Sequence, residues 1–516
     1  MPTSPTTVLI VGSGPTGLTL AIELARRAVD VRIIDKTPGF PRSSRAKGPN
    51  PRSLEVLEDL GVVGEVLAAS SAPLPMRKYR NGVPIADAAP FADARPTPDA
   101  PYDRPRMIAQ WRLEEILRAR LAEYGVRVEL GSELVGLAEG RTSVTAALAG
   151  GGEIEARYVA GCDGGHSAVR KLLGVPFEGK TDETQMMVCG DVEAEGPDRG
   201  FWHQWFDEDG AVMLCPIPGT RSGWWFQAGP ETDASGAPVP PSLDSFRRLF
   251  AKHTRLPGSG LSDATLLSTY RVNERLAERY RVGRVFLAGD AAHVHSIAGG
   301  LGMNTGIQDA YNLGWKLARV ASGRADPALL DTYEEERLPI AADALDLSAE
   351  RLRATMEAIR KPGGGLDSAV SERTNGLGGG YRWSSLATGG GTGRLRAGDR
   401  APDAPCRDLA TGTPRRLFEA FAGPHFTLLG FGPGTAQALR EAAGAHDGEL
   451  RAYGVDVGGP HGLADDGGHA RTAYGIGPDE DLLVLVRPDN HVALIIPPGD
   501  LGAVGAYLNG AALERA

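Results

Sequence analysis

A glycine-rich strand–helix–strand unit near the amino terminus restricts the fold more than any other feature. Residues 8–11 are an apolar run, and the segment GSGPTG follows with Gly12, Gly14 and Gly17. A helical pattern comes next, and a second apolar strand ends on Asp35. In such a unit the first glycine permits a tight turn, the second lets the backbone approach a pyrophosphate, the third allows close helix packing, and the acid can hold a ribose hydroxyl. This order predicts a fold that binds an adenine dinucleotide.

A second strand–turn–helix stretch lies far along the chain, at residues 284–318. Its strand, residues 285–288, ends on Gly289 and Asp290, and a turn with three glycines leads into a helix whose small and apolar residues share one face. The helix would place backbone N–H groups near a carboxylate that can accept hydroxyl hydrogen bonds. This arrangement suits a ligand with a sugar-alcohol chain and an anionic ring. An ordinary crossover between two strands has the same spacing.

Composition limits the partners of the chain. Its 516 residues are 42% hydrophobic and 23% charged, as in a soluble globular protein with more than one domain. The formal charge of -10 leaves no basic excess for nucleic acid or an anionic membrane surface. The four cysteines are scattered, and no apolar run approaches a membrane-spanning length. We therefore expect a cytoplasmic protein without disulfides or a metal site.

Several motifs in a fixed order resemble those of the FAD-dependent group A flavoprotein monooxygenases, the aromatic hydroxylase class. The carboxy-terminal segment is similar to the thioredoxin-like domain of the phenol hydroxylase branch, which includes hydroxylases of aromatic polyketides. As in that branch, the segment lacks a redox pair, because Cys406 is its only cysteine. The motifs are GSGPTG at 12–17, RxxRA at 42–46, a helix that starts at Gln110, CDGGHSAVR at 162–170, and AGDAAH with GGLGMNTGIQDAYNLGWKLA within 288–318.

The resemblance implies an α/β fold with three parts: a Rossmann-like FAD-binding domain of the p-hydroxybenzoate hydroxylase type, an antiparallel-sheet substrate domain, and a C-terminal thioredoxin-like domain. Residues 1–178 would form the first part of the FAD-binding domain, and residues 271–390 its second part with helices and a linker. Residues 179–270, with aromatic strand patterns between turns, would form the substrate sheet, a wall for a planar ring. Residues 395–516 would form the thioredoxin-like domain.

The same resemblance assigns contacts to FAD. The pyrophosphate would lie on the glycine turn, the adenosine ribose beside Asp35, and the isoalloxazine at the start of the second helix. Asp163 is associated with pyridine nucleotide binding as well. The residues with an expected cofactor contact are Gly12, Gly14, Pro15, Thr16, Gly17, Asp35, Lys36, Arg45, Gln110, Leu134, Asp163, Asp290, Gly302, Met303 and Asn304. Ser296 and Ile297 stand where the family often has two prolines, so the conformation of that loop is left open.

The implied activity is hydroxylation of a phenolic or polycyclic aromatic substrate, including polyketides, with NADPH or NADH and O2, through a flavin C4a-hydroperoxide. The expected partners are a small aromatic substrate and O2, with a homodimer as the candidate assembly. A Baeyer–Villiger or epoxidising enzyme would share these motifs and differ only in its pocket. A non-catalytic flavoprotein that sequesters an aromatic compound is a third interpretation. The sequence identifies no catalytic residue, and we interpret His293 and His295 as structural or solvent-facing.

Overall fold

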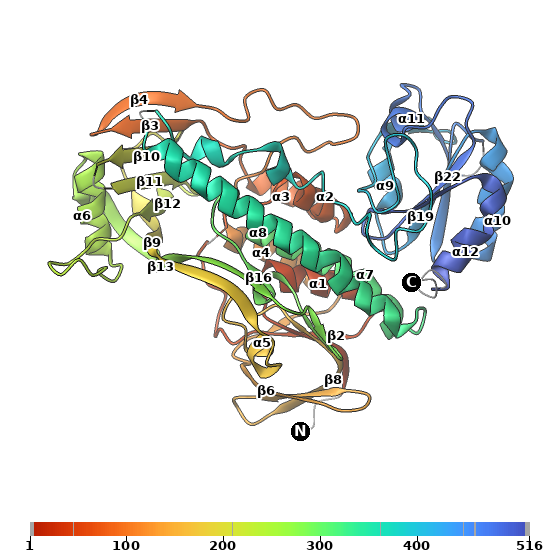
Figure 1. The fold of residues 1–516 in the computed structure, drawn as a ribbon, viewed down its shortest axis with the longest axis horizontal. Coiled ribbons are helices and arrows are strands. Elements are labelled where there is room, and N and C mark those ends of the chain that lie inside the picture. The colour runs from red at the N-terminus through yellow and green to blue at the C-terminus, as the bar shows by residue number, and fades with distance from the viewer. Residues whose placement is uncertain are drawn as a thin grey trace.

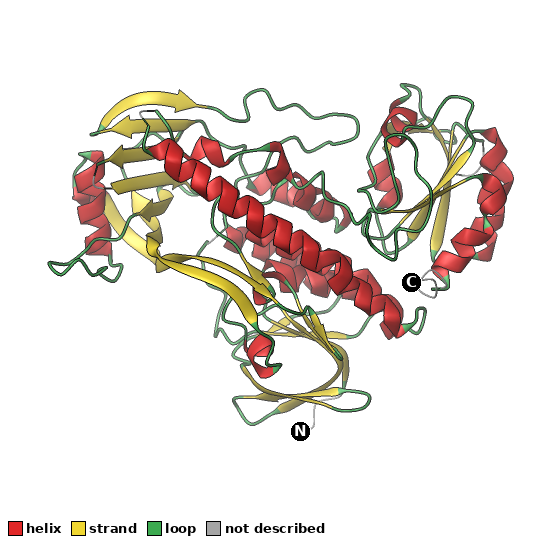
Figure 2. Ribbon diagram, in the orientation of Figure 1, coloured by secondary structure: helices red, strands yellow, loops and turns green. Residues whose placement is uncertain are grey.

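Three sheets and one long helix organise the chain. A computed structural model describes residues 5–44, 46–208, 210–361, 363–446, 448–458 and 461–510, without the side chains of residues 182–185 and 259. Helix α8 (Asp331–Ile359) runs across the molecule in front of the first two sheets, and the third sheet belongs to a separate C-terminal unit (Figures 1 and 2). Within these ranges every helix is too short or too polar to span a lipid bilayer.

The first sheet contains the glycine-rich unit. Its strand order is β14-β15-β8-β1-β2-β5, and β6 and β7 continue it from β8. Strands β15, β8, β1, β2 and β5 pair in parallel, and parallel strands buried on both faces are apolar along their length. The bounds are β1 (Thr6–Val11), β2 (Val31–Ile34), β5 (Val128–Glu129), β6 (Leu134–Glu139), β7 (Val144–Leu148), β8 (Glu153–Gly161), β14 (Arg281–Val282) and β15 (Val285–Leu287).

Helices of the first domain bring distant parts of the sequence together. Helix α1 packs against both α7 and α4, and α7 also packs against α2 and α8. The bounds are α1 (Pro15–Ala25), α2 (Pro51–Asp59), α3 (Val63–Ala69), α4 (Gln110–Glu123), α5 (Ala168–Leu172) and α7 (Gly302–Ala321), with 3-10 turns at η2 (Gly289–Ala291), η3 (Pro327–Leu330), η4 (Leu366–Ala369) and η5 (Glu372–Asn375).

The second sheet is the predicted antiparallel sheet, with additional strands at both edges. Its order is β16-β13-β9-β12-β11-β10-β3-β4, and the pairs from β13 to β10 are antiparallel, which confirms the antiparallel pairing; only β10, β11 and β12 form a meander, because β9 lies between β12 and β13. Strands β3 and β4 precede residue 179 in the sequence. They join this sheet through β3, which pairs in parallel with β10 and antiparallel with β4. The bounds are β3 (Met76–Arg80), β4 (Val83–Ala88), β9 (Phe177–Ala194), β10 (Trp202–Asp207), β11 (Gly210–Pro216), β12 (Gly223–Ala228), β13 (Leu261–Ala277) and β16 (His293–Val294), with α6 (Leu243–Thr254) and η1 (Gly258–Gly260).

The third sheet forms the C-terminal α/β domain, drawn in blue in Figure 1. Its order is β18-β17-β21-β20-β19-β22-β23, a mixed sheet in which β19 pairs in parallel with β20 and antiparallel with β22. The bounds are β17 (Pro405–Asp408), β18 (Pro414–Arg416), β19 (Phe426–Phe431), β20 (Leu450–Val455), β21 (Gly462–Ala464), β22 (Leu482–Val486) and β23 (Val492–Ile496), with α9 (Leu417–Phe421), η6 (Pro433–Thr435), α10 (Ala436–Ala445), α11 (His469–Tyr474), η7 (Pro498–Asp500) and α12 (Gly502–Leu508).

A buried ionic cluster joins this domain to the first. Glu336 of α8 accepts from Lys316 of α7 at 2.6 Å and from both terminal nitrogens of Arg487 at 2.6 and 2.9 Å. Asp489, which follows β22, pairs with Arg487 and accepts from the indole of Trp315 at 3.0 Å. All four charged groups are buried. Because buried charges are tolerated only when paired, this cluster fixes how the C-terminal domain meets α7 and α8.

We predict that Glu336→Gln lowers the free energy of unfolding by about 3–5 kcal/mol, because it leaves two buried cations without their shared anion. Thermal and urea unfolding measure this change. The control is Glu357→Gln, which removes the same charge from an exposed ion pair with Lys361 on the same helix and should have little effect. Equal stability of the Glu336 and Glu357 variants would show that the cluster does not hold the domains together.

Candidate functional site

Two helix N-termini without side-chain caps face the same region. Helix α1 starts at Pro15 after Gly14, and α7 starts at Gly302 after Leu301, and no side chain of the described residues caps either helix. Helices α2, α5 and α6 have a side-chain cap, but α3, α4 and α8 have none either among the described residues, so what distinguishes α1 and α7 is that their starts lie together. The first backbone N–H groups of an uncapped helix are unsatisfied donors in a positive field, which suits an anionic group.

Thr16 holds the two helix starts together. A Cβ added to Gly289 would lie 2.5 Å from Oγ1 of Thr16, and one added to Gly306 would overlap that same oxygen. Only glycine fits at both positions, so the start of α1 packs directly against η2 and the first turn of α7. The glycine-rich unit and the stretch at 284–318, which are far apart in the sequence, are therefore packed against each other.

The three glycines of the first turn have different surroundings. Gly12 has φ +101°, and a Cβ there would overlap the carbonyl oxygen of Cys162. A Cβ on Gly17 would overlap the carbonyl oxygen of Gly12. A Cβ on Gly14, by contrast, would meet no atom within 4 Å. Gly12 and Gly17 are thus needed by the fold itself, whereas Gly14 leaves open space above the start of α1, where a pyrophosphate would fit.

Asp35 lies directly after β2 and closes over the glycine turn. Its carboxylate accepts from the backbone N–H and hydroxyl of Ser13 at 2.9 and 2.7 Å, and from those of Thr37 at 2.9 and 2.8 Å. Partial burial opposes ionisation, but these hydrogen bonds outweigh it and lower the pKa of Asp35. Asp35 therefore stays ionised beside the turn, and the exposed Lys36 follows it.

Gln110 fastens the loop that carries the RxxRA motif. Its side chain accepts from the N–H of Ala46 at 3.1 Å, and its own N–H donates to the hydroxyl of Ser44 at 3.0 Å. Arg45 lies outside the described residues. Leu134 is the buried first residue of β6. The start of α4 therefore holds Ser44 and Ala46 in place.

Asp163 organises the end of β8. It accepts from the hydroxyl of Ser167 at 2.5 Å and from the N–H of Ala168 at 2.6 Å, and so fastens the start of α5. Its Cα lies 2.8 Å from the Cβ that Gly12 would carry, so the glycine turn rests on this segment. In the described structure its contacts are those of an N-terminal capping residue.

The start of α7 is joined to the loop before α2. Asn304 is buried, accepts from the N–H of Asn50 at 2.8 Å and donates to the carbonyl of Gly300 at 2.8 Å. Met303 packs against the core of the first domain. Asp290 is exposed in η2, and its Oδ1 lies 3.9 Å from the Cβ that Gly302 would carry. The carboxylate and the uncapped helix start are therefore neighbours.

Asp309 was not identified from the sequence, yet it supports this turn. Its Oδ2 accepts from the N–H of Gly289 at 3.0 Å and contacts Nε2 of His293 at 2.6 Å, and its Oδ1 accepts from Arg337 at 2.7 Å. Burial opposes ionisation, but Arg337 and His293 outweigh it and lower the pKa of Asp309 to about 2. His293 is fully buried and the ring of His295 lies 4.9 Å from it, so neither faces solvent. Ser296 is buried and donates to the carbonyl of Ser348, whereas Ile297 is exposed.

The second sheet adds an aromatic surface next to the start of α4. Trp225 and Cys215 lie opposite each other on β12 and β11, and they form one apolar cluster with Met107, Trp111 and Trp202. These side chains lie on the sheet face opposite to α6. The sheet can therefore serve as a wall against which a planar ring packs, as its sequence suggested.

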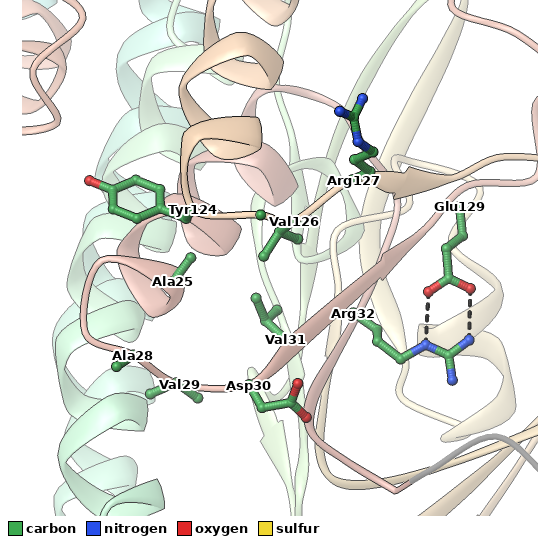
Figure 3. A pocket seen from close by; sticks show the side chains of 11 residues that line it. Ala25, Ala28, Val29, Asp30, Val31, Arg32, Tyr124, Val126, Arg127 and Glu129 are labelled. Atoms are coloured by element: carbon green, nitrogen blue, oxygen red, sulfur yellow. Dashed lines mark hydrogen bonds and ion pairs between the residues drawn. The ribbon is translucent and has the colours of Figure 1, made fainter.

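A separate pocket of about 470 Å³ lies at the other end of β2 from Asp35 (Figure 3). On one side of it Arg32 and Glu129 form a two-pronged ion pair, with distances of 2.8 and 2.7 Å. Because ligands of parallel α/β sheets bind at the carboxyl ends of the strands, we do not include this pocket in the candidate site. Its lining residues are Ala25, Ala28, Val29, Asp30, Val31, Arg32, Tyr124, Gly125, Val126, Arg127 and Glu129.

We predict that Gly14→Ala weakens FAD binding at least about tenfold, equal to about 1.4 kcal/mol, without destabilising the protein free of FAD. The added methyl group meets no protein atom but occupies the space above α1. Quenching of flavin fluorescence measures the affinity, and thermal unfolding of the FAD-free protein measures stability. Gly39→Ala, also in open surroundings but outside the turn, is the control. Unchanged affinity in the Gly14 variant would contradict this placement of the pyrophosphate.

Comparisons with known proteins agree with the geometry. A family model described as FAD binding domain matches residues 5–348, and one described as phenol hydroxylase, C-terminal dimerisation domain, matches residues 455–516. A flavin-dependent monooxygenase of Mycobacteroides abscessus is 42% identical over 439 residues, which cover 83% of this chain and 88% of the relative. A pentachlorophenol 4-monooxygenase of Sphingobium chlorophenolicum is 34% identical over 465 residues, which cover 85% and 82% of the two chains.

A solved structure shows the same arrangement. The ternary complex of aklavinone-11 hydroxylase with FAD and aklavinone matches with a TM-score of 0.83 and 27% identity, and the match covers 100% of both chains. The FAD-binding match alone spans both the glycine turn and the start of α7. From these matches, this chain belongs to the FAD-dependent flavoprotein monooxygenases, in the branch that includes phenol hydroxylases and the hydroxylases of aromatic polyketides.

Proposed function

We propose that this protein hydroxylates a phenolic or polycyclic aromatic compound, such as a polyketide, with FAD, O2 and NADPH or NADH. The observation that carries the proposal is the pair of uncapped helix starts, α1 and α7, next to the aromatic face of the second sheet. The relatives support the substrate class, since they include a pentachlorophenol 4-monooxygenase and a 6-methylpretetramide 4-monooxygenase.

The residues present fit FAD. Open space above Gly14 and the uncapped backbone N–H groups that follow Pro15 in the first turn of α1 suit the pyrophosphate, and the ionised Asp35 with Lys36 suits the adenosine ribose. Further contacts that we propose, on the family resemblance, are those of Arg45 and Gln110 with the phosphates and ribityl chain, Leu134 with adenine, Asp163 with FAD and the nicotinamide nucleotide, Asp290 with the ribityl region, and Gly302, Met303 and Asn304 with the isoalloxazine.

Bound FAD would supply the redox chemistry, taking a hydride from the nicotinamide and activating O2 so that one oxygen atom reaches the substrate and the other leaves as water. The protein supplies position and electrostatics. The start of α7 directs N–H groups and a positive helix end toward negative charge, an effect of about 0.3–2 kcal/mol. Asn304 ties this helix start to the loop before α2. The apolar cluster around Trp225 keeps water away from the substrate ring.

Turnover with product analysis tests the proposal. We expect phenolic substrates to accelerate NADPH oxidation several-fold and to yield a product heavier by one oxygen atom on the ring. A lactone or an epoxide would instead identify the Baeyer–Villiger or epoxidising alternative. A protein with full FAD occupancy whose NADPH oxidation no aromatic compound accelerates would contradict the proposed function and favour sequestration.

We further propose that the protein forms a homodimer and acts in the cytoplasm. The match of residues 455–516 to a dimerisation domain supports the assembly. The four cysteines are free thiols, which suits a reducing compartment. The dimer is expected to involve the C-terminal domain.

Sedimentation velocity of the FAD-loaded protein at micromolar concentration should give twice the 54.3 kDa of one chain. Sedimentation at the mass of one chain would contradict the proposed assembly. The FAD-loaded Glu336→Gln variant distinguishes contacts between two chains from contacts between the domains of one chain. Glu336 lies between domains of the same chain, so its substitution weakens only the contact within the chain.

A further inference from the structure

The two faces of the second sheet differ in chemistry. Side chains alternate between faces along a strand. On one face Val192, Trp224 and Phe226 pack against Phe246 of α6 in an apolar cluster. On the other face Cys215 of β11 and Trp225 of β12 lie opposite each other, and Trp225 lies opposite Asp191 of β9. A buried acid in a row of apolar and aromatic residues needs an explanation.

Asp191 is only partly satisfied. The residue is 5% exposed, and its Oδ2 accepts from the N–H of Ser44 at 2.9 Å. Its Oδ1 is buried and has no hydrogen-bond partner among the described residues. Burying a polar atom without a partner is unfavourable unless a ligand supplies one. The free oxygen therefore points to a bound group that donates a hydrogen bond.

Lys47 brings a cation to the same place. Its ammonium lies 5.6 Å from the ring centre of Trp202 and 5.7 Å from that of Trp225. Within the described part of the chain it makes no side-chain hydrogen bond or ion pair, and the indole N–H groups of both tryptophans also have no acceptor. One cation and two indole N–H donors without acceptors therefore belong to the same cluster as the acid, and these are groups that bind an ionised oxygen.

This cluster lies beside the proposed position of the flavin ring. Lys47 precedes Gly48, whose carbonyl oxygen is 3.5 Å from Nδ2 of Asn304, and Asn50 donates to Oδ1 of the same side chain. Asn304 belongs to the first turn of α7. The loop that carries Lys47 is therefore attached to the helix start where we place the isoalloxazine.

We propose that Asp191 is the base that ionises a phenolic substrate, and that Lys47 holds the resulting phenolate between Trp202 and Trp225. This inference rests on the proposed function and deepens it. The phenol O–H bond breaks, a new O–H bond forms on Oδ1 of Asp191, and the electron pair stays on the phenolate oxygen. The ring becomes richer in electrons at its ortho and para carbons, where an electrophilic oxygen adds.

Oxygen transfer gives a dienone, which becomes the dihydroxylated ring when the proton on the attacked carbon moves to the ketone oxygen. Asp191 returns its proton to solvent, and solvent supplies the proton with which the second atom of O2 leaves as water. The reductant is the nicotinamide nucleotide of the proposed function.

Burial tunes the acid–base properties of both groups. It raises the pKa of Asp191 to about 7, although the N–H of Ser44 and the charge of Lys47 oppose the rise. Burial lowers the pKa of Lys47, and it raises the pKa of the neighbouring Cys215 thiol to about 12, so this thiol stays neutral. The other group facing Lys47 is the thiol of Cys189. Asp191 is thus a base that is active above about pH 7 and lost below it.

Binding of 2-naphthol to the FAD-loaded protein tests the proposal. Free phenols ionise near pH 10, so at about pH 8 the free compound is neutral, and its ionised form absorbs at longer wavelength in the near ultraviolet. We expect wild-type protein to bind it as the anion with no net proton release, because the proton moves to Asp191. Calorimetry in buffers of different ionisation enthalpy counts the protons. The anion signal should fall as pH drops through about 7.

Two variants and a control complete the test. Asp191→Asn should bind the neutral form, or release one proton to solvent when it binds the anion, and Lys47→Met should bind only the neutral form. Glu193→Gln, which removes the same charge from the same strand, should behave as wild type. Because Asn can still accept from Ser44, Asp191→Asn should keep its FAD and unfold no earlier than wild type.

Binding of neutral 2-naphthol by the wild type, absence of binding, or an Asp191→Asn variant that binds the anion without releasing a proton would overturn the inference. Failure of the proposed function gives a different result from failure of this inference. The protein would then bind the anion, but the bound compound would not accelerate NADPH oxidation.

Discussion

The close packing of the start of α1 against η2 and α7 is the interaction on which the rest of the structure depends. Thr16 fills a space that two glycines, Gly289 and Gly306, leave for it, and a methyl group at either would collide. This contact turns two distant segments into one surface with two uncapped helix starts. A dinucleotide has two anionic regions, a pyrophosphate and a flavin ring edge, and the surface offers one helix start to each.

Buried charges hold this surface in place. Asp309 ties the turn at Gly289 to Arg337 of α8, and Glu336, the preceding residue of that helix, ties α8 to Arg487 of the C-terminal domain. Adjacent residues of α8 thus connect the cofactor side and the domain interface. Such clusters add little net stability compared with an apolar core, but they penalise every arrangement that separates the partners. Their value to this protein is a single, fixed geometry.

Local patterns predicted the parts of the site that depend on backbone. The glycine turn, the acid after β2 and the glycine-rich start of α7 follow from short-range rules, so the sequence located them. Side-chain clusters that form across long distances could not be located in this way. Asp191 appears in the sequence as one acid in a strand, and Lys47 as one cation in a loop. Only the register of β9 with β12, and the attachment of the loop to Asn304, bring them together. Local pattern does not place the edge strands β3 and β4 in this sheet either, because their partner β10 is distant in sequence.

The most direct measurement is a crystal structure of the protein with FAD and a phenolic ligand. The account predicts the pyrophosphate on the N–H groups at the start of α1, the flavin ring at the start of α7, and the phenolic oxygen between Lys47 and Asp191 with its ring beside Trp225. A flavin ring away from α7, or a phenolic ligand bound on another surface with Asp191 still unpartnered, would contradict it.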